Sequence, residues 1–294
     1  ERLQERQVRA EAVVDDDRGL GGGHAHVKVD GTRLERLHDH IAVDDAAVFS
    51  PTDPNVIAFV SSRRGNDGFG TTNVWTLNLS TSALNNVTGS LGFDPTRPHG
   101  YFRPSWSPDG KWLALSSDTG SDWRGHNLPT GWERTQEGSI YIVRPDGSGW
   151  KKIAGVSGYD EGSPSWSPDG KRVVFYETPV ESTWGAHRPE SINSVSSQLV
   201  SVDITSLSRT TLTSTAGFKV FPQYLNAATV AYHVKGGSTE GLYTTAGTFH
   251  STANTGIRSP RYSPDGTKLV YEKVAFSPAR ANGTPLFSFD PAWK

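Results

Sequence analysis

The sequence contains no cysteine and no long apolar run, and its charges nearly cancel. Without cysteine, the 294-residue chain can form no disulfide and has no thiol nucleophile. No apolar run approaches the roughly 18 residues that a membrane-spanning helix needs. The net charge of −2 provides no broad basic field for nucleic acid or for an anionic membrane. We therefore expect no membrane span and no nucleic-acid partner.

Several catalytic and cofactor motifs are also missing. No Gly-X-Ser-X-Gly elbow and no glycine-rich phosphate loop stands in front of a predicted helix. The acidic run at 15–17 lacks the spacing of a calcium loop. The pairs His24-X-His26 and His38-X-His40 have no third metal ligand in view, which favours solvated loop histidines. The sequence thus predicts no defined metal site and no certain cofactor, with a divalent metal left open.

The phrase Ser-Pro-Asp-Gly occurs three times, each time after an aromatic residue and before an apolar run. The copies stand at 107–110, 167–170 and 263–266, and weaker versions stand at 47–59 and 218–232. Proline presets φ for a tight turn, aspartate bonds to nearby backbone and glycine supplies positive φ. Each phrase therefore predicts a β-hairpin, and its return along the chain indicates repeated units.

A second pair of strands is predicted after each of the first two hairpins. The first pair covers 139–143 and 150–153, and the second covers 197–203 and 209–213. Four antiparallel strands per repeated unit are typical of a β-propeller blade. We predict an all-β propeller of about six four-stranded blades, or seven, with the ring closed by pairing of the N- and C-terminal strands.

The predicted propeller is a single domain that covers residues 1–294. Its parts are an irregular N-terminal blade segment at 1–40 and blades at 41–96, 97–156, 157–214, 215–254 and 255–294.

These repeats resemble the WD40-like, or PD40, repeats of the TolB family of β-propellers. The resemblance rests on the three Ser-Pro-Asp-Gly phrases and covers about residues 41–290. It implies the fold and leaves the function open, because such propellers serve as binding platforms, as lids on peptidases and as oligogalacturonate lyases. The high content of Ser, Thr, Gly and aromatic residues fits a secreted or periplasmic protein, which we expect to be a monomer.

Binding residues are expected on the rim opposite the uniform Ser-Pro-Asp-Gly turns, where the loops are long and varied. Two long connections, at 118–137 and 177–193, each carry Trp-X-X-His with Arg and Glu nearby. Indole faces can stack on sugar rings, and arginine can bind a carboxylate with two hydrogen bonds. The candidate ligand-binding residues are His99, Tyr101, Trp123, Arg124, Trp132, Glu133, Asp160, Glu161, Trp184, Arg188, Glu190 and Arg258. The alternative is that they only hold long loops against neighbouring blades.

We expect a recognition platform that binds a glycan or a protein on this rim. The alternative is a polysaccharide lyase that cleaves a uronate-containing glycan by β-elimination. His126 and His187 would then act as base and acid, and Arg103 would neutralise the uronate carboxylate. The resemblance implies a metal held by a histidine and glutamine cluster in such lyases, and this sequence has no match to that cluster. A third alternative is a propeller that belongs to a larger assembly, such as a peptidase lid or a Tol-type adaptor.

Overall fold

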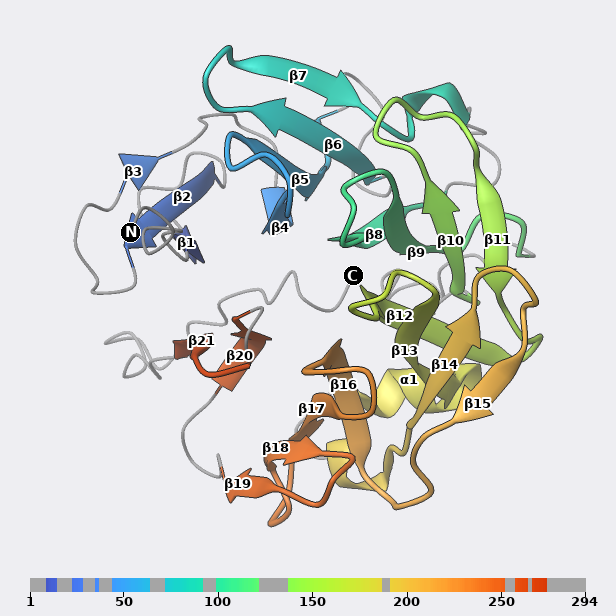
Figure 1. Cartoon of the computed structure of the whole chain (residues 1–294). Helices are drawn as coiled ribbons and strands as arrows, with labels where there is room; N and C mark the ends of the chain where they lie inside the picture. Colours follow the sequence, from blue (N-terminus) through green and yellow to red (C-terminus); the bar gives the residue numbers. More distant parts are fainter. Residues whose placement is uncertain are drawn as a thin grey trace, which may run out of the picture.

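The computed structural model describes several stretches of the chain. They are residues 9–14, 23–28, 35–36, 44–63, 72–91, 99–121, 137–186, 191–251, 257–263 and 266–273. Their strands form six antiparallel sheets, which Figure 1 shows arranged around a common centre.

Four of these sheets have four strands each, and strands that follow one another in the chain are neighbours in the sheet. The first sheet consists of β4 (Asp44–Phe49), β5 (Val56–Ser61), β6 (Asn73–Asn78) and β7 (Ala83–Asn86). The second consists of β8 (Tyr101–Trp106), β9 (Leu113–Ser117), β10 (Ser139–Val143) and β11 (Lys151–Ala154). The third consists of β12 (Tyr159–Trp166), β13 (Arg172–Pro179), β14 (Gln198–Asp203) and β15 (Arg209–Thr211). The fourth consists of β16 (Phe218–Tyr224), β17 (Val230–Lys235), β18 (Gly241–Thr244) and β19 (Phe249–Ser251).

Smaller sheets stand at the two ends of the described chain. The N-terminal sheet contains β1 (Arg9–Val14), β2 (Gly23–Lys28) and β3 (Glu35–Arg36), and the last sheet contains β20 (Ile257–Tyr262) and β21 (Leu269–Lys273). β2 contacts β4, and β20 contacts β16. The predicted ring closure pairs an N-terminal strand with a C-terminal strand. The C-terminal partner lies beyond residue 273, outside the described residues, so this closure stays a prediction.

Helical structure in the described stretches is limited to short segments. These are α1 (Val180–Ala186), η1 (Gly89–Leu91) and η2 (Ile192–Ser194). None of the described helices has the length and apolar character needed to cross a membrane. The predicted all-β class with four-stranded antiparallel sheets is confirmed.

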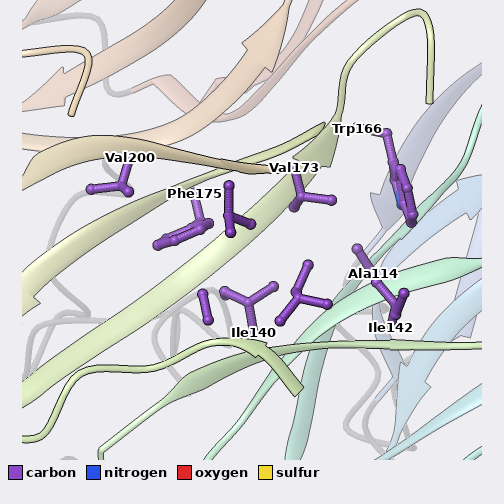
Figure 2. Packing of buried hydrophobic residues seen from close by; sticks show 10 residues of the cluster. Ala114, Ile140, Ile142, Trp166, Val173, Phe175 and Val200 are labelled. Carbon is purple, nitrogen blue, oxygen red and sulfur yellow. The ribbon is translucent and has the colours of Figure 1, made fainter. Parts of the chain in front are cut away.

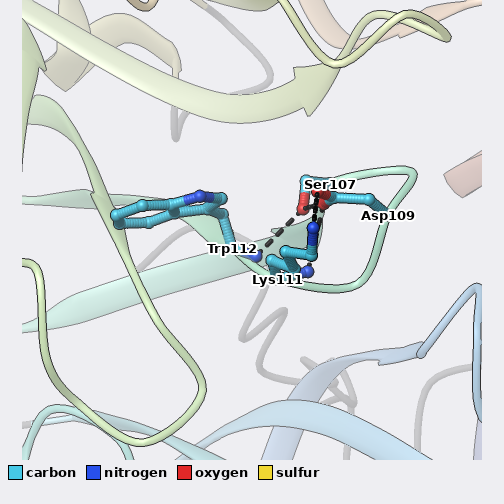
Figure 3. Close-up of polar contacts among 4 residues, drawn as sticks. All are labelled: Ser107, Asp109, Lys111 and Trp112. Atoms are coloured by element: carbon cyan, nitrogen blue, oxygen red, sulfur yellow. Dashed lines mark hydrogen bonds and ion pairs between the residues drawn. The ribbon is translucent and has the colours of Figure 1, made fainter.

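The strands nearest the common centre in Figure 1 are β4, β8, β12, β16 and β20, which we call the inner strands. The first two Ser-Pro-Asp-Gly phrases form the turns after β8 and β12, as Figure 3 shows for the first copy. The Ser107 hydroxyl accepts a hydrogen bond from the Trp112 amide at 2.9 Å and donates one to Asp109 Oδ1 at 2.7 Å. The Gly110 amide donates to the Ser107 carbonyl at 2.9 Å with a φ of 69°. Ser167 repeats these bonds in the second copy. The turn itself therefore requires the repeated residues.

The core lies between neighbouring sheets. Ile140 and Ile142 of β10 pack in one cluster with Val173 and Phe175 of β13, and all four are at most 4% exposed (Figure 2). Burial of such a side chain contributes about 1.5–3 kcal/mol. Each sheet is thus stabilised mainly by the sheet beside it.

The tryptophan in front of each of the first two phrases connects two sheets. The Trp106 indole donates a hydrogen bond to the Val48 carbonyl at 3.2 Å, and the Trp166 indole donates one to the Ser105 carbonyl at 3.0 Å. In both cases the acceptor lies on the inner strand of the preceding sheet. The indole buries apolar area and also satisfies its own N–H donor, which explains why a tryptophan recurs at this position.

Each inner strand from β4 to β20 contains a β-bulge at the same place in its unit. The bulged residues have φ between 45° and 54° and are Ala46, Arg103, Ser163, Phe221 and Ser259. A positive φ costs free energy for any residue except glycine, so its recurrence indicates that the architecture imposes it. The bulge bends the strand between its turn end and its opposite end.

Replacement of Ser107 by alanine tests the structural role of the turn. Ser107→Ala leaves the Trp112 amide without its acceptor and should lower the free energy of unfolding by about 1–2 kcal/mol. Urea denaturation followed by tryptophan fluorescence measures the loss. The control is Ser157→Ala at an exposed loop position, which should change stability by less than about 0.5 kcal/mol. Equal stability of the two variants would contradict a structural role of the Ser107 hydroxyl in the turn.

Candidate functional site

The end of the sheets opposite the Ser-Pro-Asp-Gly turns carries the long connections. β9 leads here into the connection that ends at β10, and β13 leads here through α1 and η2 to β14. The inner strands β8 and β12 begin at the same end, because Tyr101 pairs with Ser117 and Tyr159 pairs with Pro179. We call this end the loop rim.

Asp160, near the start of β12, lies between two sheets of the loop rim. Its Oδ1 accepts a hydrogen bond from the Gly138 amide at 3.2 Å, and its Oδ2 accepts one from the Tyr176 hydroxyl at 3.3 Å. A β-carbon at 138 would collide with the Asp160 carboxylate, and one at Gly162 would collide with the Tyr176 hydroxyl. The two glycines therefore make room for the Asp160–Tyr176 pair.

Asp118 occupies a related position at the end of β9. Its Oδ1 accepts a hydrogen bond from the Gly100 amide at 2.8 Å, which holds the entry to β8. His99 precedes this glycine, and its Nε2 lies 3.1 Å from the Tyr101 hydroxyl. Asp118 and His99 are close enough to interact electrostatically. The beginning of the long connection after β9 is thus tied to the beginning of β8.

Burial dominates the acid–base behaviour of these groups. Desolvation raises the pKa of Asp118 and the pKa of Asp160 to about 6, against the opposing effect of their backbone hydrogen bonds. The negative charge of Asp118 adds to the rise in the pKa of Asp160. Desolvation and the Asp118 charge also raise the pKa of Tyr141 to about 12. Both carboxyls therefore take up protons at a pH where an ordinary aspartate is ionised.

Arg103 brings a positive charge into this region from the bulge of β8. Its guanidinium carbon lies 4.8 Å from the centroid of the Phe221 ring, at the bulge of β16. Desolvation and the Asp160 charge raise the pKa of Tyr176 well above its usual range, and the nearby Arg103 opposes that rise. Tyr176 therefore remains protonated and serves as a hydrogen-bond donor.

An exposed apolar turn leads into β12, the strand that carries Asp160. Tyr159 directly precedes Asp160 in β12 and is 37% exposed, and Val156 is 40% exposed. The Tyr159 amide donates to the Val156 carbonyl at 3.1 Å, and Gly158 has a φ of 82°, so a tight turn carries both side chains. An aromatic face beside hydrogen-bonding groups can bind a ring with one apolar face and polar edges.

Two of the candidate residues have buried side chains. Tyr101 is 2% exposed and Glu161 is fully buried. Glu161 Oε1 accepts a hydrogen bond from Arg209 Nη1 at 2.8 Å, and Arg209 also pairs with Glu177. Desolvation raises the pKa of Glu161 to about 8 in spite of this arginine. Both were predicted as ligand-binding residues of the rim, whereas the structure buries their side chains because their strand position faces protein rather than solvent.

The other candidates fall into three groups. The structure brings His99, Arg103 and Asp160 to the loop rim, while Trp184 lies in α1 and Arg258 in β20. The candidates outside the described residues are Trp123, Arg124, His126, Trp132, Glu133, His187, Arg188 and Glu190. Their roles stay predictions.

Sequence reasoning did not identify Asp118 and Tyr176 as site residues. In the sequence, Asp118 was only the first residue of a long connection, and Tyr176 was the last residue of a predicted strand. Alignment of the units on their Ser-Pro-Asp-Gly phrases would have placed 116–118 and 176–178 together at the loop end of the second strand. Within the described stretches, no group of three His, Cys, Asp or Glu side chains could hold a metal ion.

Comparisons with known proteins concern the fold. No protein-family model matches the chain, and no curated protein matches its sequence. Among solved structures, TolB from Acinetobacter baumannii is similar with a TM-score of 0.59 and 18% identity, over 89% of this chain and 56% of that chain. Oligogalacturonate lyase from Vibrio parahaemolyticus is similar with a TM-score of 0.55 and 13% identity, over 90% of this chain and 66% of that chain. A prolyl endopeptidase is similar with a TM-score of 0.53 and 12% identity, over 96% of this chain and 41% of that chain.

These likenesses define an all-β chain with a TolB-like, propeller-like fold. Identities of this size support the fold alone, because the same fold hosts unrelated functions. The chain spans 56% of the length of the Acinetobacter TolB chain.

The raised pKa of Asp160 predicts a specific pH dependence of stability. A carboxyl whose pKa is higher in the folded state stabilises most below its unfolded value, and this contribution is lost as pH rises through about 6. The unfolding free energy of the wild type should fall between about pH 4 and pH 7. In Asp160→Asn this fall should be smaller, by up to about 3 kcal/mol. Urea denaturation at several pH values measures it.

The control for this pH series is Asp169→Asn in the second Ser-Pro-Asp-Gly turn. Its hydrogen bond from Ser167 lowers the pKa of Asp169, so its stabilisation is lost only at more acidic pH. A wild-type pH profile that Asp160→Asn leaves unchanged would contradict the burial of this carboxyl.

Proposed function

We propose that this protein is a recognition platform that binds a glycan on the loop rim. The observation that carries the proposal is that the loop rim combines an exposed tyrosine, Tyr159 at the start of β12, with the Asp160–Tyr176 pair and with Asp118. Tyr159 offers a flat apolar face to a sugar ring. The carboxyls and the tyrosine hydroxyl offer acceptors and donors to the sugar hydroxyls, so the site can satisfy both the faces and the edges of a pyranose.

The charge at the rim bears on the class of glycan. Asp118 and Asp160 are close enough for one to raise the pKa of the other, and the charge of Arg103 acts on Tyr176. A neutral sugar meets no electrostatic penalty beside two carboxyls. An acidic sugar has to place its carboxylate next to the arginine. We propose an extracellular or periplasmic location and a monomeric state for this platform.

Replacement of Tyr159 by alanine tests the proposed binding face. We expect the wild-type protein to bind members of an array of neutral and acidic glycans, and Tyr159→Ala to lose about tenfold in affinity, or about 1.4 kcal/mol. Isothermal titration with the best array glycan measures the loss. Tyr176→Phe should weaken the same titration by removing a rim hydroxyl that can hydrogen-bond to the sugar.

The matched control is Tyr271→Ala, because Tyr271 is an exposed tyrosine of another sheet. It should leave the affinity unchanged. Equal affinities of the Tyr159→Ala variant and the wild type, or an array on which no glycan binds, would refute the glycan platform. A screen for a protein ligand of the same rim would then follow.

A polysaccharide lyase is the second candidate function, and one arrangement favours it. Arg103 lies near the Tyr176 hydroxyl, which Asp160 holds in place. In β-elimination a guanidinium can neutralise a uronate carboxylate and so acidify the C5 proton, while a nearby donor can protonate the leaving oxygen. His126 and His187 remain the proposed base and acid.

An absorbance assay with uronate polymers tests the lyase. Cleavage by elimination creates an unsaturated product, so absorbance should rise for the wild type and be abolished in His126→Ala or His187→Ala. Arg103→Ala should lower the rate by about 100-fold. Arg144→Ala is the matched control, because its guanidinium lies 4.9 Å from the Trp112 ring at the turn end of the sheets. No absorbance rise with any polymer would exclude this activity.

A further inference from the structure

Lys219 of β16 has a fully buried side chain whose ammonium is surrounded by main-chain carbonyl oxygens. Its Nζ donates to the Ser197 carbonyl at 2.9 Å and to the Ala216 and Gly217 carbonyls at 3.3 Å each. It also donates to the Thr215 carbonyl. We call these four oxygens the carbonyl cage. In the described part of the chain, no carboxylate forms an ion pair with this ammonium.

The carbonyl cage joins two sheets at the loop rim. Three of its oxygens belong to the connection between β15 and β16, and the fourth belongs to Ser197, just before β14. Ser197 and Lys219 are also joined by their own hydrogen bonds, because the Lys219 amide donates to the Ser197 hydroxyl and that hydroxyl donates to the Lys219 carbonyl, both at 2.7 Å. The ammonium therefore holds the connection between β15 and β16 in place. Without it, several carbonyls of this connection would lose a hydrogen-bond donor.

The chemistry of the cage selects a class of ion. Its ligands are all neutral oxygens, and they carry no charge that could compensate a divalent cation. Calcium sites combine carbonyls with several carboxylates, whereas rings of carbonyls alone replace the hydration shell of a monovalent cation. Burial lowers the pKa of Lys219 to about 8, so the ammonium still carries its charge at pH 7.

We propose that the carbonyl cage is a monovalent-cation site, which the ammonium of Lys219 occupies as a cation built into the chain. Removal of the side chain vacates a site that ammonium or potassium ions can fill from solution. The bound cation then takes the place of the lysine charge and satisfies the same carbonyls. Lys219 is thus a positioning residue for the connection between β15 and β16.

Two variants distinguish the loss of the lysine charge from the creation of empty space inside the carbonyl cage. Lys219→Ala removes the ammonium and leaves space, whereas Lys219→Met removes the charge and keeps an apolar chain of similar length in place. Thermal unfolding is measured in ammonium chloride, potassium chloride and choline chloride at equal concentration. The midpoint of Lys219→Ala should rise saturably by about 2–4 °C in ammonium or potassium over choline, which is too large to enter the site.

The wild type and Lys219→Met should show no comparable difference between these salts. Calcium chloride at matched ionic strength should give Lys219→Ala no additional rise. Equal responses of the alanine and methionine variants, or a larger effect of calcium, would overturn the proposal. If Lys219→Ala is unfolded in choline chloride, folding restored by potassium supports the site, and failure to fold in every salt while Lys219→Met folds counts against it.

A measurement on the wild-type protein keeps the proposal testable if neither variant folds. A buried ammonium held by four carbonyls exchanges its protons slowly, so nitrogen-15 NMR at about pH 6 should show one protected lysine ammonium signal. The absence of any such signal would show that the cage does not hold a charged ammonium, and would overturn the proposal.

Discussion

Each sheet of this protein buries its faces against the sheets beside it, and the rest of the structure depends on this packing. A single small sheet leaves an apolar face exposed, so its stability comes from its neighbours. Ile140 and Ile142 meet Val173 and Phe175 across such an interface. The Trp166 indole adds a directional bond to the preceding inner strand. Packing between sheets therefore fixes the distance between neighbouring sheets and their offset along the strand direction.

The candidate site is a consequence of that arrangement. Asp160 belongs to one sheet and accepts its backbone hydrogen bond from Gly138, which precedes a strand of another. The narrow space between sheets removes water from Asp160 and Asp118, and this desolvation raises the pKa of each carboxyl. Tyr159, in the same strand as Asp160, remains exposed. The rim thus combines partly desolvated polar groups with a solvent-facing aromatic ring, which is the combination that a recognition surface needs.

Equivalent positions in successive repeats hold residues with different polar side chains. The position two residues before the bulge holds Tyr101 in one unit, Glu161 in the next and Lys219 in the one after, and all three are buried. Each satisfies its polar group differently: Tyr101 through His99, Glu161 through Arg209, and Lys219 through backbone carbonyls. A buried polar group is stable only with a partner, so each of these side chains has a partner of its own. The common backbone therefore carries different internal polar networks.

The sequence by itself determined the repeated hairpins, because the serine, aspartate and glycine of the first two Ser-Pro-Asp-Gly phrases make bonds within a few residues of one another. The same local rules located the strands and indicated which end of each sheet carries the long connections. Only the tertiary structure decided that Glu161 is buried against Arg209, that Asp118 approaches Asp160, and that carbonyls surround Lys219. Apart from the carbonyls of the connection just before Lys219, these contacts join residues that are distant in sequence. They depend on the bulges and on how each sheet packs against the next. Local propensity contains no information about which side chain of a neighbouring unit will stand opposite.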